Sequence, residues 1–279
     1  MSTFGDIQRR RSVRTYRNEQ ISDNTYDRVT NILQEACKER TPFDGNVRLY
    51  LIKNLTSGHK AKFGTYGFIK DPQAFIAGVC KNNRNQLVNA GYVMEKTLLG
   101  MTGIGLATCW LGGTFKRKNF TKEITLNDGE IIPGVISIGY ENRMNMKEKL
   151  IRRFSTGDRR YPLETMIFRN DFNKPVAKET TGLFAEPFDA VRMAPSASNK
   201  QPWRLIITEN DTLVRFYLKK TPDYTGNFFG FEMQYIDIGI AVCHFSLVCE
   251  EKGIRGRFFI EDAVSDKEQN KYIISWKRI

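Results

Sequence analysis

Two clusters of polar side chains in this sequence could hold a charged or polar ligand, and they lie in opposite halves of the chain. The first is the segment 8–16, in which four arginines and one serine fall within residues 9–14. An arginine guanidinium is a planar, permanently charged fork that binds two phosphate oxygens at once. Ser12 can add a hydroxyl contact. The segment predicts either a compact anion receptor or a solvated basic N-terminus.

The second cluster is the stretch from Ala194 to Trp203, Ala-Pro-Ser-Ala-Ser-Asn-Lys-Gln-Pro-Trp. Its two prolines restrict the backbone and prevent a helix from continuing past Met193. Its serines and asparagine can both donate and accept hydrogen bonds. The pattern is typical of a stiff loop that could hold a flat ligand with polar atoms at its rim. The alternative is a helix stop followed by an ordinary Ser/Asn turn.

A third segment, from Gly105 to Gly113, carries paired glycines after a long helical pattern. Glycine lets the backbone approach a flat ring closely and present its N–H groups. The alternative is a glycine-containing turn between a helix and a loop. The indole of Trp110 can serve equally in packing or in ligand contact.

These clusters need regular elements to position them. Apolar spacing predicts helices near 24–39, 84–101 and 235–251. Strands are expected at 48–52, 74–79, 131–140, 203–208, 213–218, 255–261 and 271–277. A basic linker is expected from Arg143 to Arg160, and an aromatic loop at 221–233, whose Phe228, Phe229 and Phe231 are either a lid or ordinary packing.

The two long helices at 84–101 and 235–251 repeat each other at one constant offset. Three pairs of identical residues coincide under this offset: Gly91 with Gly239, Leu99 with Leu247, and Gly105 with Gly253. We therefore expect an α+β fold made of two fused copies of one unit, with the first half at 1–160 and the second at 161–279.

Composition limits the function classes. The chain has 279 residues, 41% of them hydrophobic and 12% aromatic, which is enough for a true core. The formal charge is +12, but basic residues are dispersed among acidic ones, so we expect no nucleic-acid partner. No apolar run predicts a membrane span or a signal peptide, and the five cysteines lack metal-site spacing. We expect a cytoplasmic protein without a metal or a membrane partner.

All three segments resemble the nitroreductase family. The decamer is similar to that family's flavin loop, Pro-Ser-x-x-Asn-x-Gln-Pro-Trp, and Arg10 to Tyr16 resembles its opening, Arg-x-Ser-Val-Arg-x-Tyr. Gly105 to Gly113 resembles its Gly-Leu-x-x-Cys-Trp-Leu-Gly-Gly. Arg160, before Tyr-Pro-Leu-Glu, resembles a closing arginine that often contacts phosphate.

The resemblance implies a site shared between two units, because nitroreductases are intertwined homodimers with flavin at the subunit interface. Here the first copy keeps the basic opening and the Gly-Gly segment, and the second keeps the Pro/Ser/Asn loop. We expect a single-chain, tandem nitroreductase with one surviving composite FMN site. Its implied cofactor-binding residues are Arg10, Arg11, Ser12, Arg14, Trp110, Leu111, Gly112, Gly113, Arg160, Pro195, Ser196, Ala197, Ser198 and Asn199.

The implied activity is an FMN-dependent oxidoreductase, with NAD(P)H as electron donor and a small nitroaromatic or quinone-type acceptor in a ping-pong reaction. The chemistry would be carried by FMN, with no catalytic side chain. The alternative is a flavin-binding protein with little turnover, acting as a carrier or sensor. The fused pair is expected to be a monomer or a weak homodimer.

Overall fold

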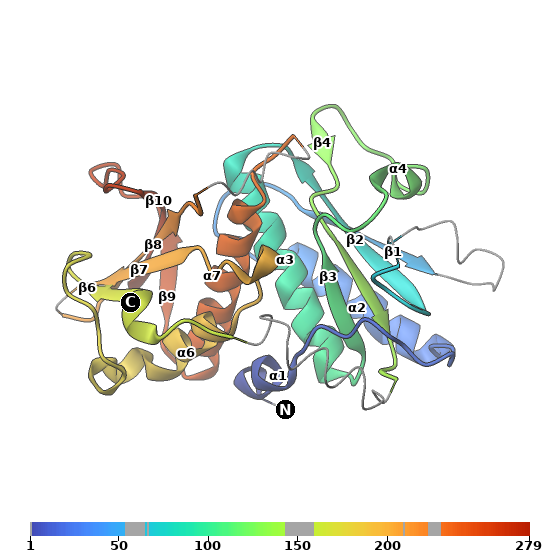
Figure 1. The fold of residues 1–279 in the computed structure, drawn as a ribbon, viewed down its shortest axis with the longest axis horizontal. Helices are drawn as coiled ribbons and strands as arrows, with labels where there is room; N and C mark the ends of the chain where they lie inside the picture. Colours follow the sequence, from blue (N-terminus) through green and yellow to red (C-terminus); the bar gives the residue numbers. More distant parts are fainter. Residues whose placement is uncertain (1, 54–64, 66, 143–158, 209, 223–229) are drawn as a thin grey trace.

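The computed structural model describes residues 2–53, 65, 67–142, 159–208, 210–222 and 230–279. The expected linker from Arg143 and the residues Phe228 and Phe229 fall largely outside these ranges. Figure 1 shows two β-sheets, one on each side of a central pair of long helices. The chain has an α+β fold, as expected.

The elements of the first half are contributed by residues 3–139. They are α1 (Thr3–Arg9), α2 (Asp23–Lys38), β1 (Arg48–Lys53), β2 (Ala74–Lys81), α3 (Arg84–Gly103), β3 (Ala107–Leu111), α4 (Arg117–Phe120), β4 (Glu130–Ile131) and β5 (Val135–Gly139).

The elements of the second half follow from residue 163. They are η2 (Leu163–Thr165), β6 (Ile167–Arg169), η3 (Lys178–Thr180), η4 (Gly182–Phe184), α6 (Ala185–Met193), η5 (Ala197–Asn199), β7 (Trp203–Ile207), β8 (Leu213–Lys219), α7 (Gln234–Glu251), β9 (Gly256–Phe259) and β10 (Asn270–Arg278).

The two sheets have the same strand order. The first runs β1-β2-β5-β3 and the second runs β7-β8-β10-β9, and every neighbouring pair in these two paths is antiparallel. Each sheet adds one further strand, since β4 pairs with β2 and β6 pairs in parallel with β7. Because order and direction agree strand by strand, the expectation of two copies of one unit is confirmed.

The copies are joined where α3 and α7 cross at the two glycines of the repeat. A Cβ atom on Gly91 would lie 2.1 Å from the carbonyl oxygen of Ile236, and one on Gly239 would lie 2.0 Å from that of Val88. The contact is reciprocal, so the two helices are related by an approximate two-fold axis. Side chains cannot fit at this crossing, and the backbones touch directly.

The two long helices also end in the same way. The N–H of Leu106 donates to the carbonyl of Met101 at 2.9 Å, and that of Ile254 donates to Cys249 at 2.8 Å. Gly105 and Gly253 have positive φ angles of 85° and 69°. Both ends are Schellman caps, in which a left-handed glycine lets later N–H groups reach back to the last turn.

Two sequence-based expectations were wrong in detail. The expected strand at 131–140 is interrupted after Ile131, because Pro133 has no N–H to donate to a ladder, and β4 and β5 pair with β2 separately. The segment 105–113 is more than a turn, since 107–111 form strand β3 in the sheet. Helix α1, which was not expected, packs against α6 and α7 of the second half.

The division into 1–160 and 161–279 remains a proposal. Within the described residues, no helix is long and apolar enough to cross a bilayer. In the same part of the chain, no group of three His, Cys, Asp or Glu side chains is arranged to hold a metal ion.

Candidate functional site

The basic opening of the chain lies along strand β3. Ser12 forms a parallel bridge with Thr108, and the N–H of Val13 donates to the Thr108 carbonyl at 2.9 Å. Burial raises the pKa of Cys109 in the same strand, while the charges of Arg14 and Arg10 and a hydrogen bond with Ser12 oppose this rise. The structure therefore gathers Arg10, Ser12 and Arg14 around one point of the first sheet.

Arg10 and Arg11 are in different situations, although they are adjacent. Among the described residues, no group accepts a hydrogen bond from Nε or Nη1 of Arg10, and both atoms are buried. Arg11 is exposed and forms a two-point ion pair with Glu141. Buried donors without an acceptor are rare in folded proteins, so the Arg10 guanidinium is suited to an anionic ligand.

The loop after α6 has a strained backbone that several hydrogen bonds hold in place. Ser198, Asn199 and Gln201 have φ angles of 50°, 54° and 48°, a region that costs a non-glycine residue about 1 kcal/mol or more. The N–H of Gln201 donates to the Ser196 hydroxyl at 2.8 Å. The N–H of Ala197 donates to Oδ1 of Asp237 in α7 at 2.8 Å. Strain kept in a rigid loop between a helix and a buried strand is typical of a binding site.

Asn199 and Arg160 are in direct contact. Nη1 of Arg160 donates to Oδ1 of Asn199 at 3.1 Å, and Nη2 donates to the Met193 carbonyl at 3.2 Å. Nδ2 of Asn199 donates to the Arg159 carbonyl at 2.8 Å. The asparagine amide thus anchors the chain that enters the second half, and Arg160 is held at the edge of the loop.

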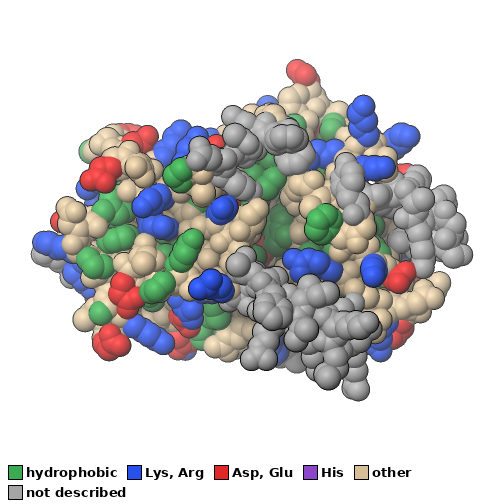
Figure 2. Space-filling model, in the orientation of Figure 1, with side chains coloured by type: hydrophobic (Ala, Val, Ile, Leu, Met, Phe, Trp, Pro, Cys, Tyr) green, Lys and Arg blue, Asp and Glu red, His purple; other side chains and the backbone are tan. Residues whose placement is uncertain are grey.

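The Gly-Gly segment reaches the same helix end as this loop. A Cβ atom on Gly112 would lie 2.9 Å from the sulfur of Met233, which immediately precedes α7. Ala197 binds Asp237 in the first turns of α7. Segments from the two halves, following β3 and α6, therefore converge at the N-terminal end of α7. Figure 2 shows the surface hollowed between the two halves on one face of the molecule.

Leu111 and Trp110 contribute mainly to the protein interior. Leu111 is buried within β3. The indole N–H of Trp110 donates to Oε2 of the fully buried Glu95 at 2.6 Å. Its hydrogen-bonding group is thus used inside the protein, and only its ring face could contact a ligand.

A family model described as "Putative TM nitroreductase" matches residues 2–249. The chain belongs to this nitroreductase family. None of the curated proteins matches it. A crystal structure from Thermotoga maritima, described as a putative nitroreductase, is similar with a TM-score of 0.61 and 18% identity, covering 100% of this chain and 94% of that one.

Other solved nitroreductases are similar to part of the chain. One from Desulfitobacterium hafniense with bound FMN has a TM-score of 0.43 and 18% identity, covering 52% of this chain and 92% of that one. Another, from Clostridium difficile, has a TM-score of 0.42 and 19% identity, covering 55% and 92%. Family membership places the chain in a class of FMN-dependent oxidoreductases.

Within this nitroreductase fold, Arg117 is a residue of the site region that the sequence analysis missed. Its guanidinium donates to the Gly112 carbonyl at 2.6 Å and to the Ile132 carbonyl at 3.2 Å. It lies 4.5 Å from the ring centroid of Phe115 and 5.3 Å from that of Phe231. Burial lowers the pKa of Arg117 to about 10, so it remains a cation at neutral pH.

The contact of Arg117 with the Gly112 carbonyl orients the peptide group that joins Gly112 to Gly113. In a trans peptide the carbonyl and the following N–H point in opposite directions, and the described residues contain no cis peptide. A carbonyl held by Arg117 therefore turns the Gly113 N–H away from Arg117. Arg117 follows Lys116 in a short basic run that looks solvated, and no sequence spacing signals its role.

Asp237 is a second residue that the sequence analysis missed. Burial raises its pKa to about 8, the charge of Glu232 acts in the same direction, and the N–H of Ala197 opposes both. Its Oδ2 atom is buried and has no partner in the described part of the chain. A lone acidic residue in an apolar helix pattern is the signal that could have drawn attention to it.

The matching position in the first copy, Asn89, is bonded differently. Its Oδ1 accepts from the Phe43 N–H at 3.0 Å, and its Nδ2 donates to the Phe43 carbonyl at 2.8 Å. Gln86 donates to the Asp44 carbonyl at 2.7 Å. Side chains of α3 thus bind the first-copy loop, and their hydrogen bonds occupy the backbone groups of Phe43 and the carbonyl of Asp44. In sequence, this first-copy loop (residues 37–46) lacks the serines and the Gln-Pro-Trp of the second-copy loop.

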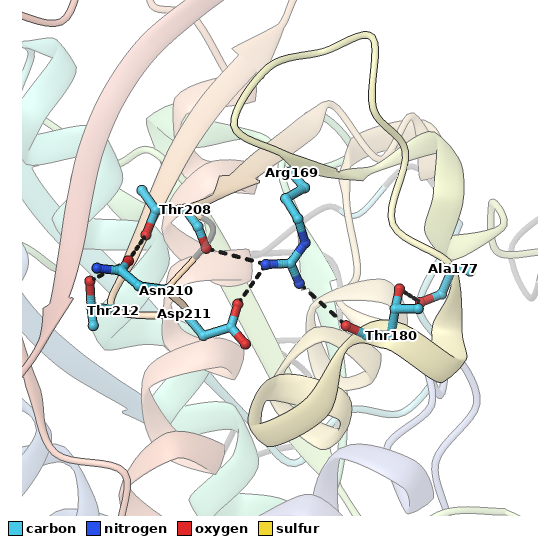
Figure 3. Close-up of polar contacts among 7 residues, drawn as sticks. All are labelled: Arg169, Ala177, Thr180, Thr208, Asn210, Asp211 and Thr212. Atoms are coloured by element: carbon cyan, nitrogen blue, oxygen red, sulfur yellow. Dashed lines mark hydrogen bonds and ion pairs between the residues drawn. The ribbon is translucent and has the colours of Figure 1, made fainter.

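A groove of about 640 Å³ opens on the second sheet, lined in part by Thr208, Asn210 and Thr212. Figure 3 shows the contacts beside it: Arg169 donates to Asp211 at 2.8 Å and the hydroxyls of Thr208 and Thr212 both donate to Asn210 at 2.8 Å. These bonds connect the turn between β7 and β8 to the end of β6. We assign them a structural role.

Proposed function

We propose that this protein is an FMN-dependent oxidoreductase that takes electrons from NAD(P)H and passes them to a small nitroaromatic or quinone-type acceptor. The observation that carries the proposal is the pair of buried Arg10 nitrogens, Nε and Nη1, which have no hydrogen-bond acceptor among the described residues. Arg10 acts electrostatically on Cys109 of β3. The Gly112 segment after β3 and the Pro195–Asn199 loop both reach the N-terminal end of α7. A phosphate is a dianion near neutral pH and would supply the missing acceptors.

The hydrogen-bonding groups and charges of these residues are of the types that FMN requires. Arg10, Arg14 and Arg160 would neutralise the phosphate, with Ser12 contacting phosphate or ribityl hydroxyls. Pro195, Ser196, Ala197, Ser198 and Asn199 would support the polar edge of the ring. The backbone from Leu111 through Gly112 to Gly113 and the ring face of Trp110 would line its other side. Arg11 would make the smallest contribution, because Glu141 already neutralises it.

Bound FMN would supply the two-electron chemistry, accepting hydride from the nicotinamide donor and reducing the acceptor in a separate half-reaction. The chain's own groups bind and orient. The Gly113 N–H, turned by Arg117, is a fixed donor for negative charge that develops on the ring during reduction. Asp237 accepts a hydrogen bond from the Ala197 N–H and so fixes the loop backbone, in its protonated form at neutral pH.

A visible absorption spectrum of the purified protein tests the cofactor, and steady oxidation of NAD(P)H with a nitroaromatic or quinone tests the activity. We expect flavin bands and turnover with at least one such acceptor. A protein that stays colourless, and that does not take up added FMN, would contradict the proposal.

A second candidate is a flavin carrier or sensor with little turnover. The observation in its favour is the closed loop around Phe43 and Asn89, which indicates that one site of the ancestral pair has decayed. Flavin bands without NAD(P)H oxidation would favour this candidate. For either function we propose a cytoplasmic protein that works as a monomer or weak homodimer, with no nucleic-acid partner.

A further inference from the structure

A continuous row of buried hydrogen bonds crosses the seam between the two halves. The Trp110 indole donates to Oε2 of Glu95 at 2.6 Å. Oε1 of Glu95 lies 2.8 Å from Nε2 of His244 in α7, and Nδ1 of His244 lies 2.8 Å from the Ala190 carbonyl in α6. Glu95 and His244 are both 0% exposed.

The geometry determines where the protons are. A carbonyl oxygen only accepts, so Nδ1 of His244 must carry a proton. One further proton lies between Nε2 of His244 and Oε1 of Glu95. The pair is therefore neutral as a whole, and each of its polar atoms has a partner. A fully satisfied buried network of this kind favours one arrangement of the groups it joins.

Burial by itself would raise the pKa of Glu95. The hydrogen bond and charge of His244, the charge of Arg10 and the hydrogen bond from Trp110 outweigh it, and the net pKa is lowered. The lowered pKa favours the ionised form of Glu95, and the positive charge of Arg10 contributes to this. The same carboxylate accepts the hydrogen bond from Trp110 of β3 and is influenced by the charge of Arg10, whose Nε and Nη1 have no acceptor among the described residues.

The pair does not follow the internal repeat. Under the offset that places Gly91 on Gly239, Glu95 falls on Cys243 and His244 falls on Lys96. Lys96 points instead to Glu39 in a surface ion pair. The buried pair therefore exists once in the described structure, on the side where β3 and α6 lead into the candidate flavin site.

We propose that Glu95 and His244 are positioning residues that couple the two flavin-facing segments. They fix the position of Trp110 in the first half relative to Ala190 in the second. Residues 111–113 follow Trp110 directly, and the Pro195–Asn199 loop follows the helix that contains Ala190. A displacement of Trp110 therefore changes the position of Ala190 and of the loop that follows it, and the reverse also holds. This inference rests on the proposed flavin site.

The test uses Glu95→Gln, which keeps the shape of the side chain but removes its charge, and His244→Gln. The matched control is Lys96→Gln, which removes the neighbouring surface ion pair on the same helix. Readouts in the apoprotein are the indole N–H resonance of Trp110, assigned with Trp110→Phe, and amide hydrogen exchange in residues 107–113 and 194–201. Readouts in the holoprotein are the FMN dissociation constant and the visible spectrum of bound FMN.

We expect Glu95→Gln to shift the Trp110 resonance and to speed exchange in both segments, including the one in the other half. We expect FMN affinity to fall about tenfold, the usual effect of losing one charge-assisted buried hydrogen bond, with an altered flavin spectrum. Lys96→Gln should match the wild type in all four readouts.

A folded Glu95→Gln protein with wild-type exchange at 194–201 would overturn the proposal, whatever its melting temperature. So would an equal effect of Lys96→Gln. If Glu95→Gln does not fold, Trp110→Phe removes the hydrogen bond at the Trp110 end of the row, together with part of the ring, and the exchange readout at 194–201, in the other half, decides. If the wild type binds no FMN, the proposed function fails, while the apoprotein exchange still tests the coupling itself.

Discussion

Gly91 and Gly239 face each other where α3 crosses α7, so closely that the Cα atom of Gly239 would lie 3.1 Å from a Cβ atom added to Gly91. The two halves thus meet backbone to backbone, and the candidate flavin site lies between segments that extend from this crossing. Any change that separates the helices must also separate the two sides of the site.

Gly239→Ala should destabilise the protein, although alanine is the better helix former. Its Cβ would lie 2.0 Å from the Val88 carbonyl, and overpacking of this kind costs about 1–3 kcal/mol or more. Chemical denaturation measures the effect. Gly103→Ala at the end of α3 is the control, since its Cβ meets only the Asp6 carboxylate at 3.2 Å. Equal stability of the two variants would contradict the close crossing.

Arg10→Ala should weaken FMN binding by about tenfold to a hundredfold, because it removes a charged, buried donor pair. Arg11→Ala should change affinity much less, since Glu141 already neutralises Arg11. A fluorescence titration with FMN compares the two variants. The reverse order of effects would move the phosphate away from Arg10.

The protein should bind about one FMN per chain. The counterpart loop in the first copy has its Phe43 backbone groups bonded to Asn89 and its Asp44 carbonyl bonded to Gln86, so these backbone groups are already used within the protein. Flavin absorbance against protein concentration gives the ratio. A ratio of two would show that the first copy also binds FMN.

Arg117→Lys should reduce FMN affinity and slow reduction by NAD(P)H, even though the positive charge is kept. Lysine cannot hold the carbonyls of Gly112 and Ile132 together, so the Gly113 N–H loses its fixed direction. Stopped-flow reduction of bound flavin measures the rate. Lys118→Gln, a nearby basic position on α4, serves as the control, and a rate equal to that of the control would refute this role.

Asp237 predicts a dependence of stability on pH. Its pKa is raised from an ordinary 3.8 to about 8, so the folded state holds a proton that the unfolded state releases within that window. The stabilisation is complete below pH 3.8 and is lost as pH rises toward 8, by up to about 1.4 kcal/mol per pH unit.

Asp237→Asn keeps an oxygen for the Ala197 N–H but cannot titrate. The difference in unfolding free energy between wild type and this variant, measured by urea denaturation from pH 5 to 8, should therefore move steadily in favour of the variant. A difference that stays constant across this range would show that Asp237 is ionised in the folded protein throughout.

Local patterns in the sequence were sufficient for the long helices, most strands and the doubling of the unit. Apolar periodicity and glycine caps depend only on neighbouring residues. The pairs Gly91–Gly239 and Gly105–Gly253 have the same separation in sequence and so indicate the repeat. Residue types alone left both the basic opening and the Pro195–Asn199 loop open to ordinary structural roles, and the resemblance to the nitroreductase family is what marked them as candidate site segments.

Only the tertiary structure decided how these segments meet. It made 107–111 a strand, since a short apolar run becomes a strand only when a neighbour such as β5 offers its hydrogen bonds. It also revealed Arg117, Asp237 and the Glu95–His244 pair, whose partners lie far away along the chain or in other elements. Burial and pairing with residues distant in sequence determine the pKa values and hydrogen bonds of these side chains, and local sequence spacing predicts neither.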